Sequence, residues 1–230
     1  MSAAVTAAVL LIALPVAFNA AFALLAARFD YPDILRRPTA EILERFRKGG
    51  SGLVLLWWAF AMTAVLLAPL AVLLAAALDG AHPALLGAGV TVGVLAAVVQ
   101  FLGLIRWPFL VPYLARADAE PGATAARREA IDVVFQSFNR YLGVAVGEHL
   151  GFLFTGAWSI LVGAAITQGT AVPGWLGLVG ISVGAVLVLC SLEFVGPFEL
   201  RGWKLAGTLT PVAYVLWSLW LAATGVALLI

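Results

Sequence analysis

Residues 52–78 read GLVLLWWAFAMTAVLLAPLAVLLAAAL, and residues 79–83, which follow directly, read DGAHP. The first stretch contains no charged side chain and exceeds the roughly 20 apolar residues that an α-helix needs to cross a bilayer. The second is a short polar turn, after which residues 84–105 are again mostly apolar. This pattern predicts a tight antiparallel hairpin of two membrane-spanning helices.

The rest of the chain continues this pattern. Hydrophobic residues make up 63% of the sequence and charged residues 11%, and the mean hydropathy is +1.07. These values are typical of membrane proteins. A second short turn, residues 168–173, predicts another tight hairpin. We therefore predict an all-α polytopic bundle, a single integral-membrane domain over residues 1–230, with six transmembrane helices near residues 3–27, 52–78, 84–105, 142–167, 174–193 and 205–230.

The positive charges predict how these helices are oriented. All 13 Lys and Arg residues fall in three of the five inter-helix loops, within residues 28–48, 106–140 and 201–204. Basic loops remain cytoplasmic because Lys and Arg resist translocation. We expect these loops in the cytoplasm and both chain ends outside. The residues before the first apolar stretch include no Lys or Arg, so we do not expect a cleaved secretory signal.

Two cytoplasmic segments predict further helices. Thr39 is a candidate N-cap and Gly49–Gly50 a candidate stop for a short amphipathic helix that lies on the membrane or against the bundle. Thr124 begins a helical stretch that continues into the fourth span. Several tryptophans lie near predicted membrane boundaries, which is typical of an interfacial aromatic belt: Trp57, Trp58, Trp107, Trp175 and Trp203.

Glycines spaced four residues apart in the third, fourth and fifth spans predict close packing between helix backbones. We expect this packing to be internal to the six-helix protein, while a homo-oligomer also remains open. Trp217 and Trp220 lie within the last span, where we expect them to pack between helices.

Composition also excludes several classes of function. A net charge of +1 without a concentrated basic face argues against a nucleic-acid partner. The clustered arginines are better explained as topology signals and as contacts with lipid headgroups. Cys190 is the only cysteine and can form no intrachain disulfide. We find no metal-ligand spacing and no signature of a known enzyme, so we expect no metal or other cofactor and assign no catalytic residue.

Polar side chains at membrane depth are the candidate ligand-binding residues, because their burial is costly unless they find partners. Counted inward at about 1.5 Å per residue, all of them fall in the cytoplasmic third of the bilayer or at its edge. This one-sided clustering indicates a pocket open to the cytoplasm, whereas a continuous pore would need polar residues through the full thickness. The candidates are Asn19, Gln100, Arg106, Arg140, Tyr141, Glu148, His149 and Glu193.

Helical geometry separates two of these candidates. Adjacent residues of an α-helix point about 100° apart, so Glu148 and His149 face different neighbours. Tyr141, Glu148 and Thr155 are spaced by seven residues and predict one polar stripe. An alternative reading is structural: Glu148 or Glu193 forms ion pairs with Arg106, Arg140 or Lys204 and clamps the helix ends.

Three strings of the sequence resemble one known family: FDYPDILR at residues 29–36 with Pro38–Thr39, FNRYLGVAVGEHLG at residues 138–151, and GWKLAG at residues 202–207 followed by WSLW at residues 217–220. They are similar to an uncharacterised family of bacterial multi-spanning membrane proteins, domain of unknown function 4386. The resemblance covers nearly the whole chain and implies a multi-pass protein of the bacterial cytoplasmic (inner) membrane. The family carries no established activity to transfer.

Three functions remain open. The first is binding or transport of a small polar or lipophilic ligand through a cytoplasm-facing pocket in which two carboxylates converge. The second is a membrane-embedded enzyme that uses Glu148 or His149 as acid or base on a lipid-soluble substrate. It requires a lateral opening and His149 within hydrogen-bond reach of a carboxylate. The third is a non-catalytic scaffold or regulator that docks a cytoplasmic partner. It requires a solid bundle with every buried charge paired and no cavity. We rank binding or transport first, because the polar groups are few and form no catalytic constellation.

Overall fold

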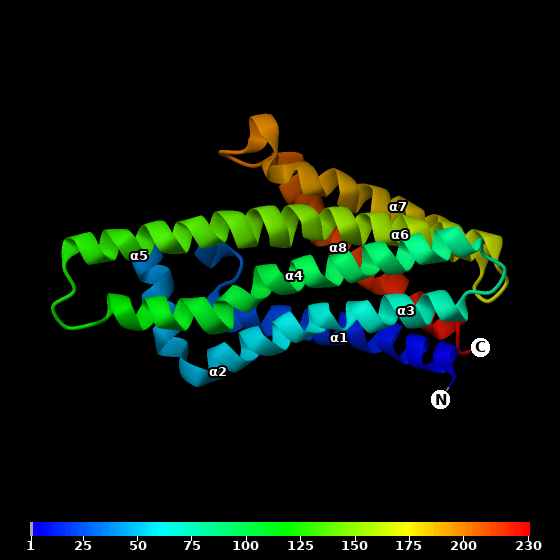
Figure 1. The fold of residues 1–230 in the computed structure, drawn as a ribbon, viewed down its shortest axis with the longest axis horizontal. Coiled ribbons are helices and arrows are strands. Elements are labelled where there is room, and N and C mark those ends of the chain that lie inside the picture. Colours follow the sequence, from blue (N-terminus) through cyan, green and yellow to red (C-terminus); the bar gives the residue numbers. More distant parts are fainter. Residues whose placement is uncertain (1) are drawn as a thin grey trace.

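The computed structural model describes residues 2–230, which form helices joined by turns without any strand in that range (Figure 1). The α-helices are α1 (Ala3–Phe29), α2 (Thr39–Val65), α3 (Leu67–Ala77), α4 (Pro83–Asp118), α5 (Ala125–Phe138), α6 (Gly151–Gln168), α7 (Gly174–Cys190) and α8 (Lys204–Ala227). A π-helix, η2 (Asn139–Leu150), joins α5 to α6. Three short 3-10 helices complete the chain: η1 (Asp33–Arg36), η3 (Ser191–Phe194) and η4 (Gly196–Phe198).

Within the described residues, six helical stretches are long and apolar enough to cross a membrane. They correspond one to one to the predicted spans, so the prediction of an all-α polytopic bundle is confirmed and the chain is a multi-pass membrane protein. The stretches are Ala3–Phe29, Thr39–Ala77, Pro83–Asp118, Ala125–Gln168, Gly174–Phe194 and Lys204–Ala227.

The third stretch extends further than the sequence predicted. We expected a loop from Arg106 onward, but α4 continues as a helix through Pro108 and Pro112 to Asp118. A proline inside a helix removes a hydrogen bond and costs about 3 kcal/mol. Here Trp107, Val111 and Leu114 are almost fully buried beside these prolines, and their packing offsets that cost.

The six stretches close into a ring in which the main neighbours of each are the stretches before and after it. α1 packs on α2 and α3, both of which pack on α4; α4 packs on η2 and α6, α6 on α7, α7 on α8, and α8 on α1. Figure 1 shows the two chain ends together at one end of this ring and the α4–α5 connection at the other. The basic loops therefore gather at the end opposite the termini.

Helices α6 and α7 touch through their backbones. A Cβ added to Gly156 would lie 2.5 Å from the carbonyl oxygen of Gly184, and one added to Gly163 would lie 2.5 Å from that of Gly177. Only glycine permits such an approach, which maximises van der Waals contact where lipid supplies no hydrophobic driving force between helices. The glycines of the fifth span thus serve internal packing, as expected.

Apolar side chains form two separate cores. One core fills the ring near the chain termini and includes Trp158, Trp217 and Trp220. The indole nitrogens of Trp217 and Trp220 donate to Ser159 Oγ and to the Leu176 carbonyl, each at 2.9 Å, as expected for helix packing. The other core lies at the basic end among α1, α2, α4 and α5.

The expectation of an aromatic belt is wrong for two of the five tryptophans. Trp57 and Trp107 are fully buried in the core at the basic end, where their rings stack with centroids 4.4 Å apart. Their side chains point toward the neighbouring helix and not toward lipid. Trp58 and Trp175 are exposed, as belt residues would be.

The short amphipathic helix packs against the bundle and not on the membrane surface. Its apolar residues Ile42, Leu43 and Phe46 are all buried, and the chain then bends at Gly50, where φ is +57°. Thr39 is not the N-cap that we expected, because Pro38 occupies that position. The Thr39 hydroxyl instead donates to the Asp132 carboxylate.

We predict that Gly156→Ala lowers the stability of the protein. The added methyl group would meet backbone atoms of α7 that cannot move independently, and overpacking of this kind costs about 1–3 kcal/mol. The measurement is the thermal unfolding midpoint in detergent. Gly87→Ala is the matched control, because a Cβ there meets no atom within 4 Å. Equal midpoints for the two variants would contradict this packing.

Candidate functional site

The π-helix η2 contains four of the eight candidate residues, Arg140, Tyr141, Glu148 and His149. π-helical turns are rare and mostly occur singly, often at functional sites, whereas η2 runs for 12 residues. Its glycines lie on α4: a Cβ added to Gly103 would be 2.6 Å from the Gly147 Cα. The two backbones are therefore in direct contact, which fixes the position of the neighbouring Glu148.

The predicted polar stripe of Tyr141, Glu148 and Thr155 is wrong. Tyr141 is 67% exposed, whereas Thr155 is fully buried. Seven residues return an α-helix to nearly the same face, but the wider turns of a π-helix rotate less per residue, so this spacing ends on a different face. Tyr141 consequently points away from the region that contains Glu148.

Arg106 lies in the gap that Gly143 leaves on η2. A Cβ added to Gly143 would be 2.6 Å from its Nη2 atom. The guanidinium donates to the Gly103 carbonyl oxygen and, at 2.9 Å, to Asn139 Oδ1, and its Cζ lies 5.4 Å from the centroid of the Trp107 ring. Among the described residues no carboxylate forms an ion pair with it.

Glu148 and Glu193 are half-buried, and within residues 2–230 neither forms an ion pair. The pairs with Arg106, Arg140 or Lys204 that the structural reading required are therefore not formed in that part of the chain. Arg140 instead pairs with Glu199, with 3.4 Å between Nη1 and Oε1, and both side chains are exposed.

Two contacts position Glu193, and one of them connects its segment to η2. The Nδ1 atom of His149 lies 2.7 Å from the Ser191 carbonyl oxygen, which joins η2 to η3. Glu193, two residues further on, lies against the first turn of α8, where a Cβ on Gly207 would be 2.8 Å from its Oε1. Arg106 lies against Gly143, five residues before Glu148 in the same π-helix. We call the side chains of Arg106, Glu148 and Glu193 the charged cluster.

The contact with the Ser191 carbonyl also limits what His149 can do. Its Nδ1 meets a backbone carbonyl, whereas the enzyme hypothesis required a carboxylate partner for this ring. The contact can hold the end of α7 against η2. It supplies no acid-base pair that involves Nδ1.

Each of the two candidate amides joins a pair of helices. Gln100 Nε2 donates to Thr155 Oγ1 at 3.1 Å and so links α4 to α6. The side chain of Gln100 also lies against Gly151, three residues after Glu148. Asn19 Nδ2 donates to Ser218 Oγ at 3.0 Å and links α1 to α8. Both amides satisfy polar groups that lipid could not.

Sequence reasoning missed a continuous series of aromatic rings beside this cluster, which we call the aromatic arc. Successive ring centroids along it lie 5.1 to 6.3 Å apart, and it joins α6, α8, α1, α2 and the turn after α1. In order, its members are Phe152, Tyr214, Phe18, Phe60, Phe22 and Tyr31. The spacing of Phe18 and Phe22 by four residues was the one available signal.

Tyr31 shows that this region is recessed. Tyr31 is half-buried, and its ring packs against those of Phe22 and Trp57. Burial, with a smaller effect from the Glu148 carboxylate, raises the pKa of Tyr31 to about 12. Its phenol therefore remains protonated, and available as a hydrogen-bond donor, at any physiological pH.

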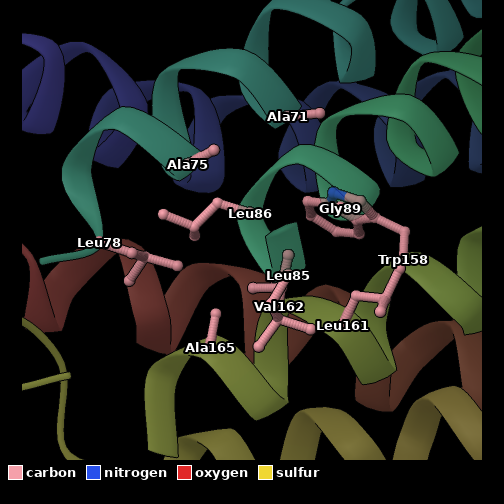
Figure 2. Close-up of a pocket in the computed structure, with 10 residues that line it drawn as sticks. All are labelled: Ala71, Ala75, Leu78, Leu85, Leu86, Gly89, Trp158, Leu161, Val162 and Ala165. Carbon is pink, nitrogen blue, oxygen red and sulfur yellow. The ribbon is translucent and has the colours of Figure 1, made fainter. Parts of the chain in front are cut away.

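Two hollows in the structure lie away from the charged cluster. Figure 2 shows an apolar cavity of about 10 Å³ among α3, α4 and α6, too small for more than about one water molecule. A larger groove of about 390 Å³ lies at the basic end between α2, α4 and α5, where Thr39, Arg128 and Asp132 contribute to its wall. Neither hollow is lined by a member of the charged cluster.

The fold and the charged cluster define a class: an all-α, multi-pass membrane protein with a polar region near the basic end of a six-helix ring. Residues 6–225 match the family model described as Domain of unknown function (DUF4386), and the chain belongs to this family. No curated protein and no solved structure matches the chain.

We predict that His149→Phe lowers the thermal unfolding midpoint, because the ring volume is kept while the contact with the Ser191 carbonyl is lost. The expected loss is about 0.5–1.5 kcal/mol, the net contribution of one hydrogen bond. Tyr141→Phe is the control, since Tyr141 is exposed and should tolerate the change. An unchanged midpoint for His149→Phe would show that this link does not stabilise the fold.

Proposed function

We propose that this protein binds, and transports, a small polar or amphiphilic ligand at the charged cluster of Arg106, Glu148 and Glu193. The observation that supports the proposal is that these charges gather in one half-buried region without forming ion pairs with one another. Charged groups at membrane depth are costly and usually mark substrate or ion pathways. A bound ligand would supply the ion-pair partners that these charged side chains do not find within the protein.

Two observations favour this function over the alternatives. A scaffold would need each buried charge paired, and the charged cluster has no such pairs. The enzyme hypothesis required a carboxylate partner for His149, and the Nδ1 atom of this ring meets the Ser191 carbonyl, so only Nε2 remains for such a partner. The groove beside Thr39 is the place where a cytoplasmic partner would dock if the scaffold function were present as well.

We further propose that the protein lies in a bacterial cytoplasmic membrane with its basic end in the cytoplasm. The 13 Lys and Arg residues support this orientation, because positive loops resist translocation. The charged cluster lies toward the basic end, so a ligand would reach it from the cytoplasm or from the inner leaflet.

The orientation predicts the behaviour of fusions to the chain end after Ile230. Alkaline phosphatase fused there should be active, because that enzyme folds outside the cytoplasm, and green fluorescent protein at the same place should be dark. Fusions after Asp118, in a basic loop, are the control and should show the reverse. Fluorescence at the C-terminal fusion would contradict the proposed orientation.

Ligand binding predicts a rise in thermal stability. Purified protein in neutral detergent should show a higher unfolding midpoint with at least one member of a panel of small amines, organic acids, sugars and lipids. A ligand at 100 times its Kd stabilises the folded state by about 2.7 kcal/mol. The rise should disappear in Glu148→Gln and persist in Glu199→Gln, which alters an exposed glutamate.

The opposite result has a clear meaning. If no compound raises the midpoint, and Glu148→Gln is merely less stable than the parent, Glu148 serves the fold and the proposed function is wrong.

A further inference from the structure

The aromatic arc lies beside the carboxylates of the charged cluster. Phe152, at one end of the arc, follows Glu148 by four residues. The ring of Phe152 lies 5.4 Å from that of Tyr214, centroid to centroid, so α8 contributes the next ring of the arc at the same place. Phe60 is buried, whereas Phe18, Phe22, Tyr31, Phe152 and Tyr214 all keep part of their surface accessible. Aromatic surface and carboxylate are thus available in one region.

The formal charges of this region are negative in sum. Glu148 and Glu193 contribute two negative charges and Arg106 one positive charge. The guanidinium of Arg106 is already engaged by the Gly103 carbonyl, Asn139 and the Trp107 ring. Arg36 lies near Glu193 but forms an ion pair with Asp33 at 2.8 Å, so it adds no net charge.

This combination suits an organic cation. An ammonium group is attracted to carboxylates and to the faces of aromatic rings, the arrangement by which proteins recognise quaternary ammonium ligands. An anionic ligand would be repelled by the two carboxylates. A metal ion would need several ligands at once, and the described residues contain no group of three His, Cys, Asp or Glu side chains that could hold one.

We infer that the ligand is an organic cation, an ammonium group carried on an apolar or aromatic body, held between Glu148 and the aromatic arc. The inference rests on the proposed function and adds the chemical class of the ligand. The carboxylate would neutralise the ammonium group, while the rings would cover the apolar body and exclude water from the pair.

Three probes of similar size separate the possibilities: benzyltrimethylammonium, benzyl alcohol and benzenesulfonate. Binding of each to the full chain in neutral detergent is measured by isothermal titration calorimetry. We expect saturable binding of benzyltrimethylammonium alone. Glu148→Gln should weaken it at least tenfold, and Phe18→Leu by roughly three- to thirtyfold, the range of a cation–π contact.

Controls and alternative variants keep the experiment decisive. Phe109→Leu removes an exposed ring away from the arc and should leave the affinity unchanged, as should Glu199→Gln. Unfolding without ligand establishes that each variant is folded. If Phe18→Leu does not fold, Phe152→Leu replaces it.

Each other outcome overturns a distinct statement. Binding of benzenesulfonate or benzyl alcohol that depends on Glu148, without binding of the ammonium probe, would overturn the organic-cation inference and leave the proposed function standing. Ammonium binding that is equally strong in Phe18→Leu, Phe152→Leu and Phe109→Leu would remove the aromatic arc from the site. Absence of saturable binding by all three probes, together with a ligand panel that causes no stabilisation, would overturn both proposals.

Discussion

The backbone contact between Gly103 of α4 and Gly147 of η2 is the constraint on which the candidate site depends. With hydrogens in place of side chains at both positions, the π-helix can lie directly on α4. Glu148 follows the contact by one residue, and Arg106 follows it by one turn on the other helix. A larger residue at either glycine would separate the helices and move both charged groups.

The positions of the two apolar cores explain why polar groups gather where they do. One core closes the ring near the chain termini, and the other closes its basic end on the side of α1, α2, α4 and α5. Glu148 and Glu193 come from η2 and η3, which contribute no large side chain to either core. Because this part of the ring has no large apolar side chains to fill it, polar side chains can stay half-buried there.

Much of the fold followed from hydropathy, turn residues and charge, because each acts over short stretches of chain. The six spans and the tight turn at Asp79–Pro83 are local features of this kind. Local rules also gave wrong answers where packing overrides them. Pro108 does not end α4, and Thr39 does not cap α2, because each lies against another helix whose contacts the sequence does not display.

The sequence by itself determined the membrane class, the number of spans, and the gathering of polar residues toward the basic end, since all three follow from composition along one dimension. The tertiary structure decided which of those residues meet. It placed Tyr141 and Arg140 outside the charged cluster, because a π-helix turns differently from the α-helix that the spacing assumed. It also assembled the aromatic arc from five segments of the chain, an arrangement that depends on the closure of the helix ring and that no single stretch of sequence encodes.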